Sequence, residues 1–86
     1  MPEISRFFGI VIAMYYNDHA PAHFHCRYGD YLAKIDIQTG AVLDGALPRR
    51  ALSLVQEWRN LHQSELLTVW QRILDRQPHA KIDPLE

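Results

Sequence analysis

Hydrophobic positions divide the chain into a first half rich in strand patterns and a second half with a helical pattern. Residues 7–16, FFGIVIAMYY, are β-branched or aromatic at both odd and even positions. That pattern is typical of a central β-strand covered on both faces. The segment NDHAPA that follows contains Asn, Asp and Pro, which interrupt a strand. We therefore expect one strand to end near residue 16 and a proline-containing loop to follow it.

Two further strand patterns flank residues 29–30, Gly-Asp, which suit a two-residue hairpin turn. A turn at this point pairs Tyr28 with Tyr31 and continues residue by residue to His23 opposite Asp36. Directly paired residues share a face of the sheet, and a slip by one residue would mix the two faces. In this register the apolar face carries Phe24, Cys26, Tyr28, Tyr31, Ala33, Ile35 and Ile37, and the polar face carries His23, His25, Arg27, Leu32, Lys34 and Asp36.

A second turn at Thr39-Gly40 and a short fourth strand over residues 41–43 extend this hairpin into an antiparallel meander. The segment from Pro48 onward carries apolar residues at helical spacing, with no Gly or Pro inside it. A straight helix over residues 49–76 would be about 42 Å long, against roughly 20 Å for a six-residue strand. The helix must therefore bend near residues 60–64, or half of it must project beyond the sheet. We favour the bend.

These patterns predict an α+β fold in a single domain. An antiparallel meander of three to four strands spans about residues 6–44. One long bent helix or two helices, over about residues 48–76, pack on one face, and residues 77–86 form an extended tail. His23 and His25 are expected on the opposite, exposed face of the sheet.

Composition narrows the function classes. A formal net charge of −1 gives no overall attraction to nucleic acids or membranes, although seven of the nine basic residues are arginines. No run reaches the roughly 18 apolar residues that span a bilayer. The single cysteine cannot form an internal disulfide, which favours the reducing cytoplasm. Because 86 residues bury only a small core, a protein partner or a homo-oligomer is expected to add stability.

Candidate chemistry gathers in residues 18–31, DHAPAHFHCRYGDY, which hold three of the five histidines. Residues i and i+2 of a strand point the same way about 6.5–7 Å apart, so His23 and His25 can converge on one ion. A third ligand, His19 or Asp18, would leave an open position for water, as in a catalytic zinc site. Asp36, opposite His23, can be a ligand or can orient one. The first interpretation is thus a site for zinc or another divalent metal.

A second interpretation of the same residues needs no metal. His23 and His25 would act as acid and base on RNA, because the ordinary pKa of histidine, near 6.5, lets one ring accept a proton while another donates one. Asp18 and His19 would position the two rings. Arg27 and Lys34 would hold the phosphate. The alternative to both is a polar sheet surface with an ordinary loop beside it.

The segments MPEISRFFGI, DHAPAHFHCRYGDY and LHQSELLTVW resemble the short bacterial proteins of domain-of-unknown-function family 4160. The similarity covers nearly the whole chain, and the Asp-His-x-Pro-x-His-x-His segment over residues 18–25 is its most specific part. Members of that family are often encoded beside a second small protein.

The resemblance implies the toxin-like member of a two-gene toxin–antitoxin module, with a small cognate partner protein encoded nearby. Joined to the second interpretation, it predicts a cytoplasmic, histidine-dependent ribonuclease. The alternative is a non-enzymatic module that binds a protein partner and carries a histidine-ligated divalent metal. The sequence does not decide between the two.

Overall fold

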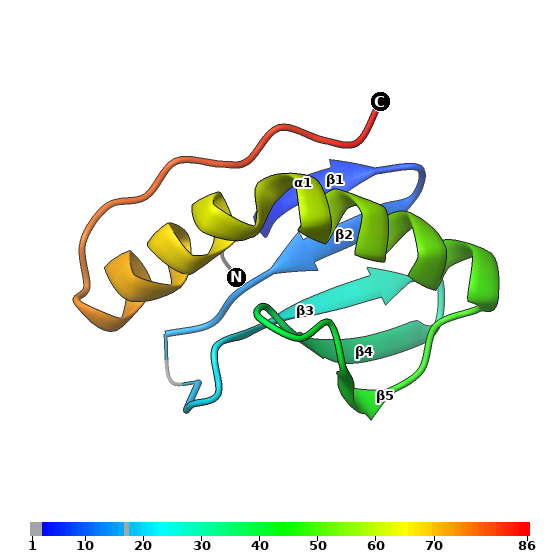
Figure 1. Ribbon diagram of the computed structural model, residues 1–86, viewed down its shortest axis with the longest axis horizontal. Helices are drawn as coiled ribbons and strands as arrows, with labels where there is room; N and C mark the ends of the chain where they lie inside the picture. The colour runs from blue at the N-terminus through cyan, green and yellow to red at the C-terminus, as the bar shows by residue number, and fades with distance from the viewer. Residues whose placement is uncertain (1–2, 17) are drawn as a thin grey trace.

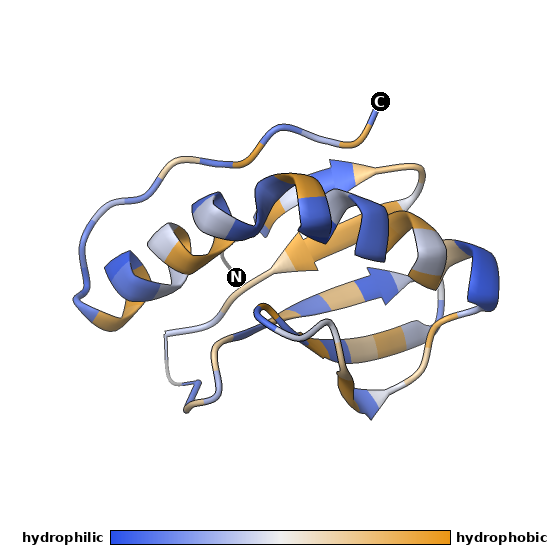
Figure 2. Ribbon diagram, viewed as in Figure 1, coloured by the Kyte–Doolittle hydropathy of each residue, from blue (hydrophilic) through white to orange (hydrophobic). Residues whose placement is uncertain are grey.

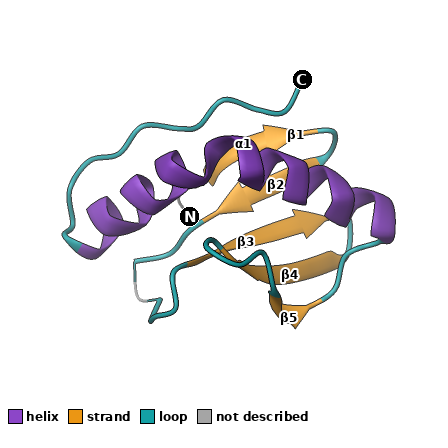
Figure 3. Ribbon diagram, in the orientation of Figure 1, coloured by secondary structure: helices purple, strands orange, loops and turns teal. Residues whose placement is uncertain are grey.

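The computed structural model describes residues 3–16 and 18–86 and shows a five-stranded antiparallel sheet crossed on one face by a single helix (Figures 1 and 3). Every strand pairs with its neighbours in sequence, in the order β1-β2-β3-β4-β5. The predicted α+β fold and meander are confirmed, with five strands instead of three to four. The Met-Pro start of the family resemblance lies outside the described residues. The elements are β1 (Glu3–Phe7), β2 (Ile10–Ala13), β3 (His23–Tyr28), β4 (Tyr31–Asp36), β5 (Val42–Gly45) and α1 (Arg49–Leu74).

The fifth strand arises because the expected continuous strand over residues 7–16 is wrong. The chain reverses at Phe8 and Gly9, so that Phe7 of β1 pairs with Ile10 of β2. Phe8 and Gly9 have φ angles of 50° and 80°. Gly9 was the one local sign of a turn, but bulky residues such as Phe8 rarely adopt positive φ, so the apolar run predicted a continuous strand. As a result β2 is an interior strand, between β1 and β3.

The predicted register of the β3–β4 hairpin is confirmed. The strands pair residue by residue from Tyr28 with Tyr31 to His23 with Asp36. The predicted apolar face turns toward the helix, and its central residues Phe24 and Ile35 are fully buried. The turn chemistry and the clean alternation therefore fixed which side chains point away from the helix.

One helix, α1, covers the apolar face, and its apolar side is turned toward the sheet (Figure 2). The helix is kinked at His62, whose φ of −122° and ψ of 24° are not helical. The kink falls within the predicted stretch 60–64. Beyond it, the second half of α1 extends past the strands toward the loop between β2 and β3 (Figure 1). The largest fully buried side chains are Ile4, Ile10, Ile12, Met14, Phe24, Ile35, Ile37, Val55, Trp58, Leu66 and Ile73.

Residues after α1 form an extended tail that runs back along the helix beside β1 (Figure 1). The backbone N–H of Ile82 donates to the carbonyl oxygen of Ile4 at 2.9 Å. The indole N–H of Trp58 donates to the carbonyl oxygen of Asp83 at 2.8 Å. The tail thus partly covers an edge strand that would otherwise present unpaired backbone groups. In the part of the chain that the structure describes, no helix has the length and apolar character needed to cross a membrane.

Candidate functional site

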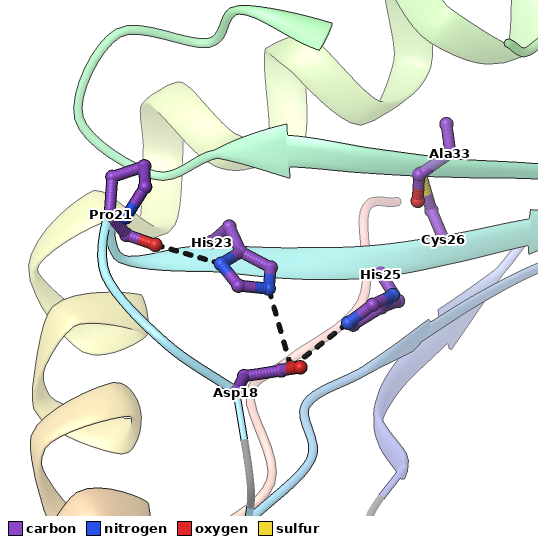
Figure 4. A network of polar contacts seen from close by, with 6 residues as sticks. All are labelled: Asp18, Pro21, His23, His25, Cys26 and Ala33. Atoms are coloured by element: carbon purple, nitrogen blue, oxygen red, sulfur yellow. Dashed lines mark hydrogen bonds and ion pairs between the residues drawn. The ribbon is translucent and has the colours of Figure 1, made fainter. Parts of the chain in front are cut away.

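Three of the predicted site residues meet where the loop between β2 and β3 folds back over the sheet. One carboxylate oxygen of Asp18, Oδ2, lies 2.9 Å from Nε2 of His25 and 3.3 Å from Nε2 of His23. Figure 4 shows Asp18 facing both imidazole rings, which project from β3 on the same side. The three residues each offer one ligand atom, and these atoms lie within 4.8 Å of one another. The loop and the two-residue spacing on β3 therefore create a compact cluster, which we call the Asp-His-His cluster.

His23 is the buried member of the Asp-His-His cluster. The prediction that His23 and His25 share the face of the sheet opposite the core is confirmed by the register. His23, however, is only 3 % exposed. Its expected exposure is therefore wrong. The cause is Trp70 on the second half of α1, whose ring centroid lies 5.1 Å from that of His23. The part of α1 beyond the kink at His62 therefore packs over His23, at the end of the sheet next to the β2–β3 loop.

The loop backbone fixes the protonation of the His23 ring. Nδ1 of His23 lies 2.7 Å from the carbonyl oxygen of Pro21. A carbonyl oxygen can only accept, so Nδ1 carries a hydrogen and donates it. The other ring nitrogen, Nε2, is buried and has no hydrogen-bond partner among the described residues. Its 3.3 Å approach to Asp18 is close enough for an ion pair, but the geometry is not that of a hydrogen bond.

His25 is the accessible member of the Asp-His-His cluster, with 28 % of its side chain exposed. Nε2 donates the 2.9 Å hydrogen bond to the carboxylate of Asp18, so in this arrangement it carries a ring hydrogen. The ring of Tyr15 meets the His25 ring edge-on, with centroids 4.6 Å apart. His25 is thus held on two sides and still reaches solvent, as a group that contacts a substrate must.

The other predicted site residues do not join this cluster. His19 is exposed and lines a hollow beside Asp18 and His23, outside the compact set of three. Asp36 serves the turn after β4, because its Oδ1 accepts the backbone N–H groups of residues 38 and 39 at 2.8 and 2.9 Å. Arg27 is exposed further along β3. Lys34 lies on β4 directly opposite His25.

Sequence reasoning did not predict the contact between Trp70 and His23. One signal was available. An unbroken helical pattern longer than the strands places its last apolar residues beyond the sheet, so they must pack on something else. His23 lies at that end of the sheet, against Trp70 of the second half of α1. The carbonyl group of Pro21 was also missed, since no sequence pattern reports backbone acceptors.

Cys26, between the two histidines in sequence, takes no part in the site. It points into the core, is 1 % exposed and has its Sγ 3.6 Å from the carbonyl oxygen of Ala33. Burial raises the pKa of its thiol to about 12. The thiolate that a nucleophile requires is therefore not formed near neutral pH.

Comparison with known proteins identifies a family for this chain. The family model described as "Domain of unknown function (DUF4160)" matches residues 9–71, which include β2, β3, β4, β5 and most of α1. The match contains all three residues of the Asp-His-His cluster, together with Trp70. No similar protein was found among curated sequences or among solved structures.

Proposed function

The chain belongs to the DUF4160 family, and we propose that it binds one divalent metal ion, zinc as the first candidate, through Asp18, His23 and His25. The observation that carries the proposal is the buried Nε2 of His23, which faces a carboxylate without a hydrogen bond. With its hydrogen on Nδ1, a neutral His23 directs the lone pair of Nε2 toward the negative oxygen of Asp18. A cation between them removes that repulsion, and a buried polar atom without a partner is otherwise costly.

The spacing of the ligand atoms supports zinc. Two ligand atoms on a tetrahedral zinc with bonds of about 2.1 Å are about 3.4 Å apart. The distances from Asp18 Oδ2 to the Nε2 atoms of His25 and His23 are 2.9 and 3.3 Å, and the three ligand atoms lie within 4.8 Å of one another. Binding would move the hydrogen of His25 from Nε2 to Nδ1 and replace its hydrogen bond to Asp18. Metal-ligating histidines commonly donate their second ring N–H to a backbone carbonyl, as His23 does to Pro21. Two histidines and one carboxylate also suit iron(II).

Three protein ligands fit a reactive centre better than a purely structural one. Structural zinc sites are almost always closed by four protein ligands, whereas catalytic sites keep one position open for water. Zinc lowers the pKa of such a water to near 7, which supports hydrolysis. His25 is accessible from solvent, so a substrate can approach the open position. We therefore propose a metal-dependent hydrolytic activity in place of a metal staple for a protein-binding module.

A second candidate function is RNA cleavage without metal. It is favoured by the hydrogen bond between Asp18 and His25, because a carboxylate that orients a partly exposed histidine is a common arrangement for acid–base catalysis. In this scheme His25 exchanges protons with the substrate, His23 is too buried to do so, and Lys34 contacts the phosphate. The toxin-like role within a two-gene module, with a small partner protein, is proposed for either chemistry.

Metal analysis of protein purified without a histidine tag tests the first proposal. We expect close to one zinc per chain by elemental analysis and a single high-affinity site by calorimetry. The changes His23→Gln and His25→Gln should each abolish that site. Two histidines outside the Asp-His-His cluster offer matched controls, so His62→Gln and His79→Gln should leave it intact. Metal-free protein that binds neither added zinc nor added iron(II) would rule the metal centre out.

Activity assays separate the two chemistries. If the metal is required, RNA cleavage by the zinc-loaded protein should stop in excess chelator and return when zinc is added back. If His25 acts alone, cleavage should survive the chelator and be lost in His25→Gln. Growth arrest on induced expression, abolished by His25→Gln and kept in His79→Gln, is expected for the toxin-like role. Zinc binding with no hydrolysis of any substrate would favour the metal-stapled binding module.

A further inference from the structure

Lys34 occupies the boundary between two hollows that flank the Asp-His-His cluster. It pairs directly with His25 across the β3–β4 hairpin and with Asp44 on its other side. One hollow, of about 300 Å³, lies on the side of Asp18 and His23. The other, of about 360 Å³, lies on the side of His25. Lys34 lines both of them, which no other residue does.

The two hollows have different walls. The first is formed by the loop before β3 together with Leu43 of β5. The second lies over the middle of the hairpin, with Tyr15 and Leu32 among its walls. Each has a volume at the lower end of small-molecule binding pockets, so each suits one chemical group the size of a sugar or a base. A ligand that fills both must pass over Lys34.

Charge determines what should lie at that crossing point. Lys34 is partly buried, and its amino group forms no ion pair with any carboxylate within residues 3–16 and 18–86. Asp44 lies across the strand pair and lines the second hollow, and its Oδ1 accepts the backbone N–H of Gly45. With a divalent ion bound, the metal and Lys34 outweigh the carboxylates of Asp18 and Asp44 in charge. The crossing point is then cationic and attracts an anionic group.

From this geometry, and resting on the metal centre proposed above, we propose that the substrate class is a phosphodiester. Its anionic phosphate lies between the metal and Lys34, and one of its two substituents occupies each hollow. A phosphomonoester carries only one substituent and leaves one hollow empty. A peptide fills both sides of its scissile bond but offers no negative charge there. A strand of nucleic acid meets both requirements.

The reaction is hydrolysis of one phosphorus–oxygen bond. A water oxygen forms a new bond to phosphorus while the bond to the leaving oxygen breaks. The water supplies two protons. One protonates the leaving oxygen to give an alcohol, and the other stays on the phosphomonoester product or is released to the solvent. The reaction needs no oxidant, reductant or further co-substrate. Lys34 is assigned a binding role, holding the non-bridging oxygens as negative charge builds on them.

Three chromogenic probes and the zinc-loaded protein test the proposal: bis(p-nitrophenyl) phosphate, p-nitrophenyl phosphate and a peptide p-nitroanilide. The diester should be hydrolysed at least tenfold faster than the monoester, and the peptide not at all. Lys34→Gln should lower kcat/KM for the diester at least tenfold while zinc affinity, measured by calorimetry, stays unchanged. Lys81→Gln is the matched control, because Lys81 lines neither hollow, and it should behave like the unaltered protein.

Filling either hollow provides a second, independent test. Leu43→Trp narrows the first and Leu32→Trp the second, and each should slow hydrolysis of a dinucleotide without lowering zinc affinity. A protein that binds zinc but prefers the monoester, cleaves only the peptide, or is indifferent to Lys34→Gln would overturn the phosphodiester assignment alone. Zinc binding without hydrolysis of any probe would overturn this assignment and the hydrolytic activity, but not the metal centre. Failure to bind either zinc or iron(II) would overturn the metal centre, and this assignment with it. Calorimetry therefore distinguishes the two failures.

Discussion

Nδ1 of His23 donates a hydrogen bond of 2.7 Å to the carbonyl oxygen of Pro21, and this contact decides what the rest of the ring can do. The loop backbone holds the hydrogen on Nδ1, so Nε2 keeps its lone pair whenever the ring is neutral. Trp70 packs against the ring, which is almost fully buried. In the proposed metal centre, His23 is therefore held in the ligand tautomer and position before an ion binds, which lowers the cost of binding.

This tautomer can be observed directly. In metal-free protein at pH 8, long-range ¹H–¹⁵N correlation spectra should show His23 with its hydrogen on Nδ1. Addition of zinc should shift the Nε2 resonance of His23 and leave that of His79, which is not part of the Asp-His-His cluster, in place. A spectrum with the hydrogen on Nε2 would contradict the contact with Pro21 and the proposed ligand geometry.

Asp18→Asn tests the contribution of the carboxylate. The amide keeps the shape of the side chain but removes its negative charge, so zinc affinity should fall by about 100-fold or more, measured by calorimetry. The fold should persist, since Asp18 lies in a loop outside the apolar core. Asp30→Asn, in the exposed β3–β4 turn, is the matched control and should bind zinc normally. Unchanged affinity in Asp18→Asn would remove Asp18 from the ligand set.

Trp70 should report metal binding by its fluorescence. Its ring packs against His23, whereas Trp58 packs against Phe7 and Phe24 in the core. Cobalt(II), a paramagnetic substitute for zinc, should quench Trp70 strongly on binding. The quenching should be lost in Trp70→Phe and kept in Trp58→Phe. Equal quenching of both variants would show that the ion binds elsewhere.

Cys26 gives the protein a predictable alkaline instability. Burial raises the pKa of its thiol to about 12, whereas the thiol of the unfolded chain ionises near 8.5. Above pH 8.5 the unfolded state therefore binds fewer protons than the folded state, and the free energy of unfolding falls as pH rises toward 12. Ionisation of this one thiol in the unfolded state should lower the free energy of unfolding by about 2 kcal/mol at pH 10.

Comparison with Cys26→Ala isolates this effect, because the two proteins differ only in the side chain at position 26. The variant starts less stable at pH 7, since it leaves a small cavity. Urea unfolding at pH 7, 8, 9 and 10 should show the difference between the two proteins shrinking as pH rises. A difference that stays constant up to pH 10 would mean that the thiol ionises in the folded protein at its ordinary pKa.

Much of this fold could be predicted from local sequence patterns. The rest depends on packing between residues far apart in the chain, which such patterns do not report. The pairing of His23 with Asp36 followed from alternation and a Gly-Asp turn, both of which are local. The turn at Phe8 was missed because an aromatic residue at positive φ carries no local signal. For the site, the shared face of the two histidines was predictable. The burial of His23 was not, because it depends on Trp70, which is 47 positions away in the chain.

Arg59 is a buried polar connection between α1 and the turn that follows β4, which Gln56 and Gln63 also contact. Although charged, it is 9 % exposed, and its guanidinium donates three hydrogen bonds of 3.0 Å: from Nη1 to the carbonyl oxygen of Ile37, from Nε to Gln56 and from Nη2 to Asn60. Arg59→Met keeps the length and apolar stem of the side chain but removes every donor. It should lower the free energy of unfolding by about 2–4 kcal/mol in urea titrations. Hydrogen bonds from a charged donor contribute about 1.5–3 kcal/mol each, and the total loss is smaller than the sum of three because water can reach some of the freed acceptors.

The matched control is Arg50→Met, at an exposed position on the same helix, which should change the free energy of unfolding by less than about 0.5 kcal/mol. Arg59 lies on the helix side of the sheet, away from the Asp-His-His cluster, so Arg59→Met should still bind zinc below its own unfolding midpoint. A loss under about 1 kcal/mol would show that the guanidinium contributes no more than its apolar stem.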